Sequence, residues 1–111
     1  MLLDKSRVLE KVQAAGIVAV VRGNSKEEAY KTAKACIKGG VSAIELAFTA
    51  PNADKVIDQL NKEYANDSKV LIGAGTVLDP ATARIAIIAG AKFIVSPSFS
   101  TEVAKICNLY T

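Results

Sequence analysis

Short apolar segments alternate along the chain with longer amphipathic segments, and this alternation is the feature that most constrains the fold. Residues 17–21 read Ile-Val-Ala-Val-Val, and the segment that follows carries charged side chains at helical spacing. An apolar run without polar alternation is typical of a parallel strand that is covered on both faces. The pattern therefore predicts β–α units that form a parallel sheet.

Four such units follow a leading segment, residues 1–15, in which a helix is expected near Leu3 to Ala14. Side chains that cap helices, such as Ser25 and Asp79, and glycines that end helices mark the boundaries of the units. Strands are expected at residues 17–21, 41–46, 70–72 and 91–95, and the third of them runs into the glycine-rich residues 73–77. Helices are expected from the Ser25 cap to about residue 38, and at residues 52–64, 80–89 and 102–108.

The number and size of these units indicate a fold class. The four units occupy residues 16–111, about 24 residues each, and eight of them would approach the roughly 200 to 250 residues of a (βα)8 barrel. We therefore expect residues 1–111 to form a single α/β domain of the TIM-barrel type, comprising a leading helix and the first four βα units of a half barrel. Because an open sheet has unpaired edges and an uncovered face, such a chain should be unstable, oligomeric or prone to aggregate.

Composition excludes several kinds of chemistry and partner. The chain has no histidine, which rules out a Ser-His-Asp triad and His-ligated zinc, and no carboxylate cluster at the strand ends, so neither a metal nor a cofactor is expected. A net charge of +3 without a basic stripe or tryptophan argues against nucleic acid as a partner. No apolar run approaches the roughly 20 residues of a membrane span, and no secretory signal is recognisable, so we expect a cytoplasmic protein without membrane contact.

Candidate catalytic residues are sought at the carboxyl ends of the strands, where βα barrels place their active sites. Glu45 stands out, because a period of two puts it on one strand face with the small residues Ala43 and Ala47, while Ile44 and Leu46 lie on the other. If the apolar face meets the helices, Glu45 points into the barrel. Loss of solvent would then raise its pKa toward that of a useful acid–base group.

Other residues at the same strand ends are candidates for binding. Arg22 suits a carboxylate or phosphate of a substrate, although a structural ion pair with Glu45 would equally explain both charges. Gly75 and Thr76 let the backbone approach a ligand and offer one hydroxyl, in a segment that lacks the spacing of nucleotide-binding loops. Pro97 follows the last expected strand, where shaping the loop is a simpler role for it than contact.

Four motifs in this order resemble the aldolases that cleave 2-keto-3-deoxy-6-phosphogluconate (KDPG) and 4-hydroxy-2-oxoglutarate (KHG), a class I family of trimeric (βα)8 barrels. They lie at residues 16–22, 39–45, 72–77 and 90–97. The resemblance covers nearly all of this chain but about the first half of the family's length. It implies retro-aldol cleavage of a keto acid to pyruvate and an aldehyde, either glyceraldehyde 3-phosphate or glyoxylate, by a homo-oligomer.

The resemblance also assigns roles to residues. It implies that Glu45 is the general acid–base, that Thr76, Gly75 and Pro97 line the pocket around the pyruvyl group, and that Arg22 contacts an anionic group. Thr49 follows Glu45 in the loop where some members carry an arginine, and it is taken as a further substrate contact.

The resemblance places the Schiff-base lysine of the family on a later strand, beyond Thr111, so these residues are expected to be inactive alone. Two alternatives remain open. The chain could be a non-catalytic half-barrel module that self-associates through its open edges. It could also belong to a different phosphate-handling βα barrel, since fold alone does not assign function.

Overall fold

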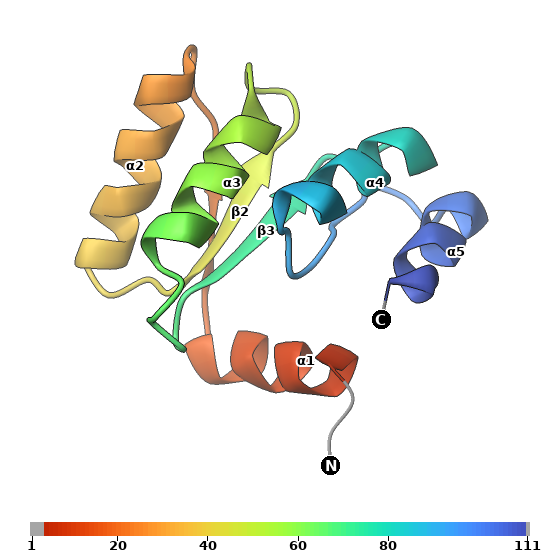
Figure 1. The fold of residues 1–111 in the computed structure, drawn as a ribbon, viewed down its shortest axis with the longest axis horizontal. Coiled ribbons are helices and arrows are strands. Elements are labelled where there is room, and N and C mark those ends of the chain that lie inside the picture. Colours follow the sequence, from red (N-terminus) through yellow and green to blue (C-terminus); the bar gives the residue numbers. More distant parts are fainter. Residues whose placement is uncertain (1–3, 111) are drawn as a thin grey trace.

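The computed structural model describes residues 4–110, so the expected helix start at Leu3 and the terminal Thr111 lie outside the described residues. The elements alternate as expected, with five helices and three strands in this range (Figure 1). In chain order they are α1 (Asp4–Ala15), β1 (Val18–Val21), α2 (Lys26–Lys38), β2 (Ala43–Ala47), α3 (Ala53–Glu63), β3 (Leu71–Gly75), α4 (Pro80–Ala89) and α5 (Thr101–Leu109). None of the helices in this range is long and apolar enough to cross a membrane.

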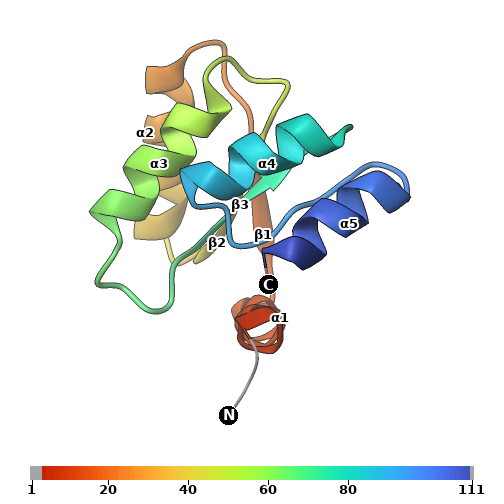
Figure 2. The ribbon, with the colours of Figure 1, turned by 45° about the vertical axis from the view of Figure 1, so that its right-hand side comes forward.

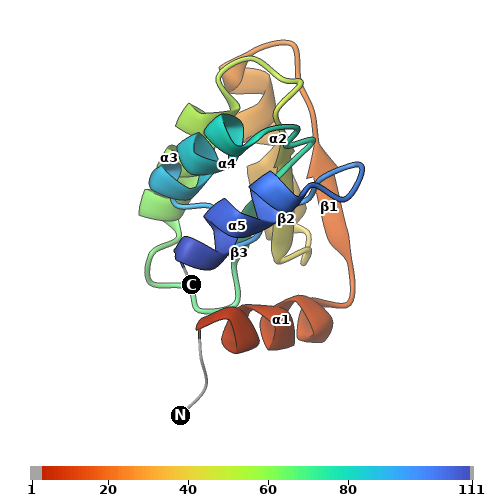
Figure 3. The same ribbon diagram turned by 90° about the vertical axis from the view of Figure 1, so that its right-hand side faces the viewer.

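The three strands form a parallel sheet in the order β1-β2-β3. The register pairs Glu45 of β2 with Val20 of β1 and with Gly73 of β3. Helices α2, α3 and α4 lie along one face of this sheet (Figures 1 and 3). The arrangement confirms the expected α/β class with parallel strands.

The hydrophobic core lies between the sheet and these helices. Ile44 and Leu46 of β2 are fully buried there, as the period of two predicts, and they pack with Ile57 and Leu60 of α3. Burying side chains of this size contributes about 1.5 to 3 kcal/mol each. The helices therefore cover the face of β2 that is opposite Glu45.

Side-chain caps fix where three of the helices begin. The Ser25 Oγ accepts a hydrogen bond from the backbone N–H of Glu28 (3.1 Å) at the start of α2. Asp79 accepts from the N–H of Thr82 (2.8 Å) before α4, and Ser100 accepts from Val103 (3.3 Å) before α5. Each cap satisfies a backbone donor that has no partner within its helix. These boundaries agree with the sequence pattern.

The structure corrects one expected element, the fourth strand. Residues 91–95 form only a single parallel bridge, between Ile94 and Ala74, instead of a full strand. Their backbone still bonds to β3, since the N–H of Lys92 donates to Ile72 O (2.8 Å) and that of Val95 to Ala74 O (2.8 Å). Thr76, directly after β3, has a left-handed φ of 55°, and the N–H of the next residue, Val77, donates to Val95 O (3.2 Å). Residues 91–95 therefore lie alongside β3 and bond to it, but with one bridge and no regular strand.

The second strand also starts later than expected, at Ala43 instead of Val41. The reason is that Gly40 and Val41 still belong to the end of α2. Their N–H groups donate to Ile37 O (3.0 Å) and Cys36 O (2.9 Å), and Gly40 takes a positive φ of 106° that ends the helix.

Helix α1 lies across the end of the sheet at which the strands begin (Figures 2 and 3). It ends at Ala15, shortly before β1, and contacts β3. Near its other end, Lys5 Nζ donates a hydrogen bond to Asn108 Oδ1 of α5 (3.2 Å). One helix therefore connects the first strand with the last described helix.

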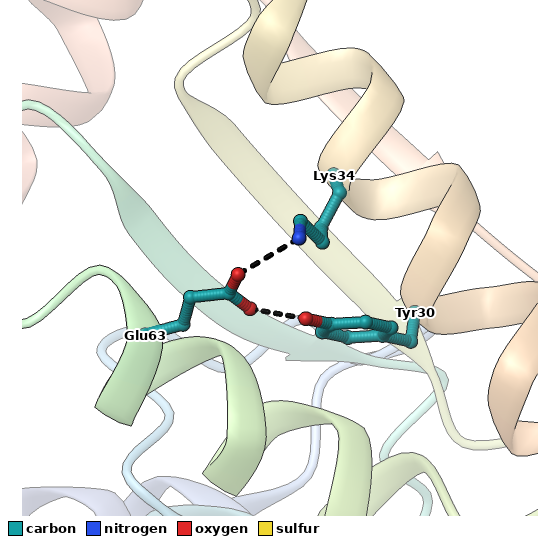
Figure 4. Close-up of polar contacts among 3 residues, drawn as sticks. All are labelled: Tyr30, Lys34 and Glu63. Carbon is teal, nitrogen blue, oxygen red and sulfur yellow. Dashed lines mark hydrogen bonds and ion pairs between the residues drawn. The ribbon is translucent and has the colours of Figure 1, made fainter.

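Tyr30, Lys34 and Glu63 join α2 to α3 on the surface (Figure 4). The Tyr30 hydroxyl donates to Glu63 Oε2, and Lys34 Nζ lies 2.8 Å from Glu63 Oε1. The bonds from Lys34 and then Tyr30 lower the pKa of Glu63, and the same carboxylate raises the pKa of Lys34. The cluster holds two neighbouring helices together by charge.

Replacing Glu63 with Gln should lower the thermal midpoint at pH 7, and the difference should shrink in acid. The pKa of Glu63 is lower in the folded chain, so its contribution is complete above the unfolded value of 4.5 and is lost as the pH falls through the folded value. Thermal unfolding at pH 7 and pH 3 measures this, with the exposed Glu10→Gln as control. A difference that does not change with pH would contradict the charged contact.

Candidate active site

Glu45 lies on the face of the sheet that the helices leave open. We call this the inner face and define it by Val20, Glu45, Gly73, Gly75 and Phe93. Val20 and Gly73 are the register partners of Glu45, so the three side-chain positions share one face of the sheet. Glu45 is half-buried, whereas its strand neighbours are fully buried against the helices or between the strands.

Two glycines of β3 make room on this face. A Cβ atom on Gly75 would overlap Glu45 Oε2 and lie 2.6 Å from Glu45 Cδ. A Cβ on Gly73 would lie 2.5 Å from the ring of Phe93. Because Gly73, not Gly75, is the register partner of Glu45, the carboxylate leans toward the carboxyl end of the sheet. Because Gly75 has no side chain, the Glu45 carboxylate can lie directly against the backbone of β3.

The surroundings of Glu45 favour its protonated form. Loss of solvent raises the pKa of the carboxyl above 4.5, and the positive charge of Arg22 partly offsets that increase. No direct ion pair joins the two side chains within residues 4–110, so Arg22 acts through its field. The two charges therefore interact without the direct contact of an ion pair. A carboxyl group with a raised pKa beside an open face can both donate and accept a proton.

Arg22 and Thr49 line one shallow pocket of about 360 Å³ at the carboxyl ends of β1 and β2. Both side chains are exposed, and the pocket also includes Asn24 and Glu28. Arg22 is thus the predicted binding residue that the structure brings close to both Thr49 and Glu45. A guanidinium in this position can bind an anionic group of a ligand that reaches Glu45.

Thr76 and Pro97 occupy the neighbouring strand ends. Thr76 follows Gly75 directly and holds its left-handed conformation, which is uncommon for a threonine. Pro97 is exposed, and the preceding Ser96 donates from Oγ to Val77 O (2.8 Å). That bond anchors the loop before Pro97 to the residues that follow Thr76. Contact of these two residues with a substrate stays a prediction.

Three further residues belong to this region although the sequence analysis did not select them. Phe93 packs against Gly73, and Asn24 and Glu28 line the pocket with Arg22. Alternation along residues 91–95 places Phe93 on the same face as Val95, which is a signal for its position. Asn24 and Glu28 have no such signal, because they flank or follow the Ser25 cap at the start of α2.

The lysines of residues 4–110 do not lie at the carboxyl ends of the strands, where Glu45 lies. Lys69 precedes β3 and Lys92 precedes Phe93, so both stand at the ends where the strands begin, and both are exposed. The remaining lysines of residues 4–110 lie on the helices. No lysine among these residues stands at a carboxyl strand end beside Glu45.

Replacing Glu45 with Gln should raise the stability of the chain at neutral pH. The pKa of Glu45 is raised in the folded state, so its charge lowers stability as the pH climbs from the unfolded value of 4.5 through the folded value. Removal of the charge abolishes this loss. Urea unfolding of both chains at pH 4 and pH 8 checks the prediction, and a wild-type chain more stable than the Glu45→Gln variant at pH 8 would contradict it.

The chain matches a known protein family in sequence. The sequence model of the family "KDPG and KHG aldolase" matches residues 8–111. The 2-dehydro-3-deoxy-phosphogluconate aldolase of Treponema pallidum is 36% identical over 100 residues, which is 90% of this chain and 46% of that protein. This chain therefore spans about half the length of that curated relative.

Solved structures agree with the sequence matches. A KDPG aldolase from Legionella pneumophila, which holds pyruvate as a covalent carbinolamine intermediate, superposes with a TM-score of 0.70 and 30% identity over 80% of this chain and 42% of its own. A 4-hydroxy-2-oxoglutarate/KDPG aldolase from TTHB1 superposes with a TM-score of 0.72 and 26% identity over 99% of this chain and 50% of its own. With its parallel α/β fold, the match of the family model over residues 8–111 and these relatives, the chain belongs to the KDPG and KHG aldolase family.

Proposed function

We propose that this chain supplies the acid–base half of the active site of a class I aldolase that cleaves KDPG or KHG to pyruvate and an aldehyde. The position of Glu45 carries the proposal. Its carboxyl group lies at a strand end on an open face, with a raised pKa and with room made by Gly75. The four matched units then form half of a (βα)8 barrel, with residues 1–111 as a single domain.

The chemistry requires an amine that adds to the C2 carbonyl of the keto acid. The carbinolamine so formed loses water to give an iminium ion, and breaking the C3–C4 bond sends its electron pair to the iminium nitrogen as an enamine. The C4 hydroxyl gives up its proton, and C4 becomes the aldehyde carbonyl. Protonation of the enamine at C3 and hydrolysis then release pyruvate and the free amine.

Glu45 is the group of this chain that suits the proton steps. Its carboxyl donates a proton as water leaves the carbinolamine, and the resulting carboxylate accepts the C4 hydroxyl proton. The carbinolamine in the Legionella pneumophila relative supports an amine mechanism. Since Lys69 and Lys92 stand at the opposite strand ends, we propose that the amine comes from outside these 111 residues.

Binding roles follow from the pocket beside Glu45. We propose that Arg22 binds an anionic group of the substrate, with Thr49 beside it. Gly75, Thr76 and Pro97 surround the pyruvyl group at the neighbouring strand ends. The exposed charge of Arg22 and the open inner face support this assignment.

The oligomer and location are further parts of the proposal. Ile85 and Ile88 on α4 are 50% and 67% exposed on the side away from the core, and apolar residues exposed together mark contact surfaces. We propose that this surface of α4 takes part in a homo-oligomer, the trimer implied by the family, in the cytoplasm.

A chimera tests the proposed function. Residues 8–111 replace the matched part of the Treponema pallidum aldolase, and pyruvate release from KDPG and KHG is followed with a coupled dehydrogenase. We expect cleavage of at least one of the two substrates, together with a borohydride-stable pyruvate adduct outside the 111 residues. A folded chimera without activity on either substrate would contradict the proposal, and an adduct on Lys69 or Lys92 would move the amine into this chain.

A further inference from the structure

Two glycines of β3, Gly73 and Gly75, lie on the inner face, and a different side chain lies over each of them. The three atoms nearest to a Cβ placed on Gly73 all belong to the ring of Phe93, at 2.5 to 2.6 Å. The three atoms nearest to a Cβ placed on Gly75 all belong to Glu45. Phe93 and Glu45 therefore divide between them the space that the two glycines leave.

The backbone bonds beside β3 put Phe93 next to Gly73. Ala74 forms a parallel bridge with Ile94, and the N–H of Ala74 donates to Phe93 O (3.0 Å). Ala74 and Ile94 pack into the core under the helices. Because successive side chains alternate between the faces of a sheet, the preceding residues, Gly73 and Phe93, share the inner face. The position of the ring over Gly73 is thus fixed by register as well as by packing.

Glu45 and Phe93 approach the same glycine from opposite sides. Gly73 is the register partner of Glu45 and lies beside Phe93, so the three residues form one row across the sheet. Neighbouring strands lie about 4.8 Å apart, so this row spans about 10 Å. The Phe93 ring reaches over Gly73 and takes the middle of the row. It fills the space into which the Glu45 carboxyl could extend directly from its own strand.

The carboxyl of Glu45 lies instead over Gly75, two residues further along β3. Two residues of a strand correspond to about 6 to 7 Å. This displacement is toward the end of the sheet where Arg22 lines its pocket and where Thr76 follows β3. A carboxyl over Gly73 would lie deeper on the inner face and farther from both.

We propose that Phe93 is a positioning residue for Glu45: its ring occupies the place over Gly73 and so directs the carboxyl to the place over Gly75. This inference rests on the proposed function, because it names the residue that holds the proposed acid–base group at the carboxyl end of the sheet. Phe93 acts through Glu45, and its role requires no contact with the substrate.

A ring in this place also keeps water from one side of the carboxyl. Phe93 and Glu45 are both half-buried, and burial is the main cause of the raised pKa of Glu45. Arg22, the charged group that offsets part of this rise, follows β1 and so lies on the other side of β2 from Phe93. Removing the ring should therefore lower the pKa of Glu45 toward 4.5 and leave the effect of Arg22 in place.

Phe93→Ala tests the inference, with Ile94→Ala as the matched control. Both variants remove a large apolar side chain from the same segment, but Ile94 packs on the helix side of the sheet. NMR titration of the 111-residue chain follows the carboxyl carbon of Glu45 and the α-protons of the two glycines. The spectrum of Glu45→Gln identifies the carboxyl signal.

The wild-type chain should show Glu45 titrating above 4.5, and the α-protons of Gly75 should shift with that titration. In Phe93→Ala the titration should move toward 4.5, and the α-protons of Gly73 should shift as well, because the carboxyl can then reach both glycines. Ile94→Ala should titrate like the wild type. Phe93→Leu keeps a smaller apolar group over Gly73 and should give intermediate values.

Kinetics of the chimera give a second measurement. Phe93→Ala should lower kcat for KDPG or KHG cleavage by about 10- to 100-fold, because a misplacement of about 1 Å impairs a proton transfer. KM should stay within about threefold, since Phe93 is not a proposed substrate contact. The titration in the pH profile of kcat should move in the same direction as the NMR titration of Glu45.

The outcomes separate this inference from the proposed function. An unchanged Glu45 titration and an unchanged Gly75 response in Phe93→Ala would overturn the positioning role, as would equal changes in Ile94→Ala. Where Phe93→Ala does not fold, the same result in Phe93→Leu would overturn it. The expected NMR shifts together with an inactive chimera would support the positioning of the carboxyl and overturn the proposed function.

Discussion

Glu45→Gln in the chimera is expected to lower kcat for KDPG or KHG cleavage by roughly 10² to 10⁴-fold, the usual contribution of a positioned acid–base group. Glutamine has nearly the same size, so it keeps the contact with Gly75 but cannot exchange a proton. KM should change little, because the proposed binding group is Arg22 in the neighbouring pocket. Steady-state kinetics with the coupled assay measure both constants.

The control for this variant is Glu27→Gln. Glu27 is an exposed residue in the first turn of α2 and has the same charge as Glu45, so its replacement should leave kcat within about twofold. The pH profile adds a second criterion. The wild-type chimera should show a titration above 4.5 that the Glu45 variant lacks, because burial raises the pKa of this carboxyl. Full activity of Glu45→Gln would assign the proton steps to another group.

Gly75→Ala is expected to cost about 1 to 3 kcal/mol of unfolding free energy and about 100-fold in kcat of the chimera. The added Cβ would occupy the position of Glu45 Oε2, and β3 is fully buried, so either the backbone or the carboxylate must move. A shift of the carboxylate by about 1 Å is enough to impair a proton transfer. Urea unfolding and steady-state kinetics measure the two effects.

Two comparisons make this prediction specific to the contact with Glu45. Gly39→Ala adds the same methyl group where the nearest backbone atom lies 3.4 Å away and φ is −80°, so stability should change by less than about 1 kcal/mol. In a Glu45→Ala background, Gly75→Ala should lose much of its cost, giving a coupling energy above about 0.5 kcal/mol. Additive costs in that cycle would show that Gly75 serves only the backbone of β3.

These two predictions concern the same contact, between Glu45 and Gly75. A flexible carboxylate on a strand is held in one place because a glycine two positions beyond its register partner lets it lie flat against the sheet. Burial raises the pKa of this carboxyl, and the positive charge of Arg22 offsets only part of that increase. These features suit the proton donor and acceptor that we propose Glu45 to be.

Local sequence determined most of the framework. Period-two alternation fixed which face of β2 carries Glu45, because successive side chains of a strand must point in opposite directions. Ser25, Asp79 and Ser100 fixed the helix starts, because a cap depends only on residues three positions apart. Both effects act within a few residues, which is why they can be predicted without the fold.

Tertiary structure decided what depends on contacts between distant segments. Residues 91–95 form one bridge with β3 instead of a strand, and Glu45 meets Gly75 because two strands align in one register. The crossing of α1 from β1 to α5 likewise has no local signal. Such contacts form only when the chain has folded, since they join residues whose separation in sequence carries no information about their distance in space.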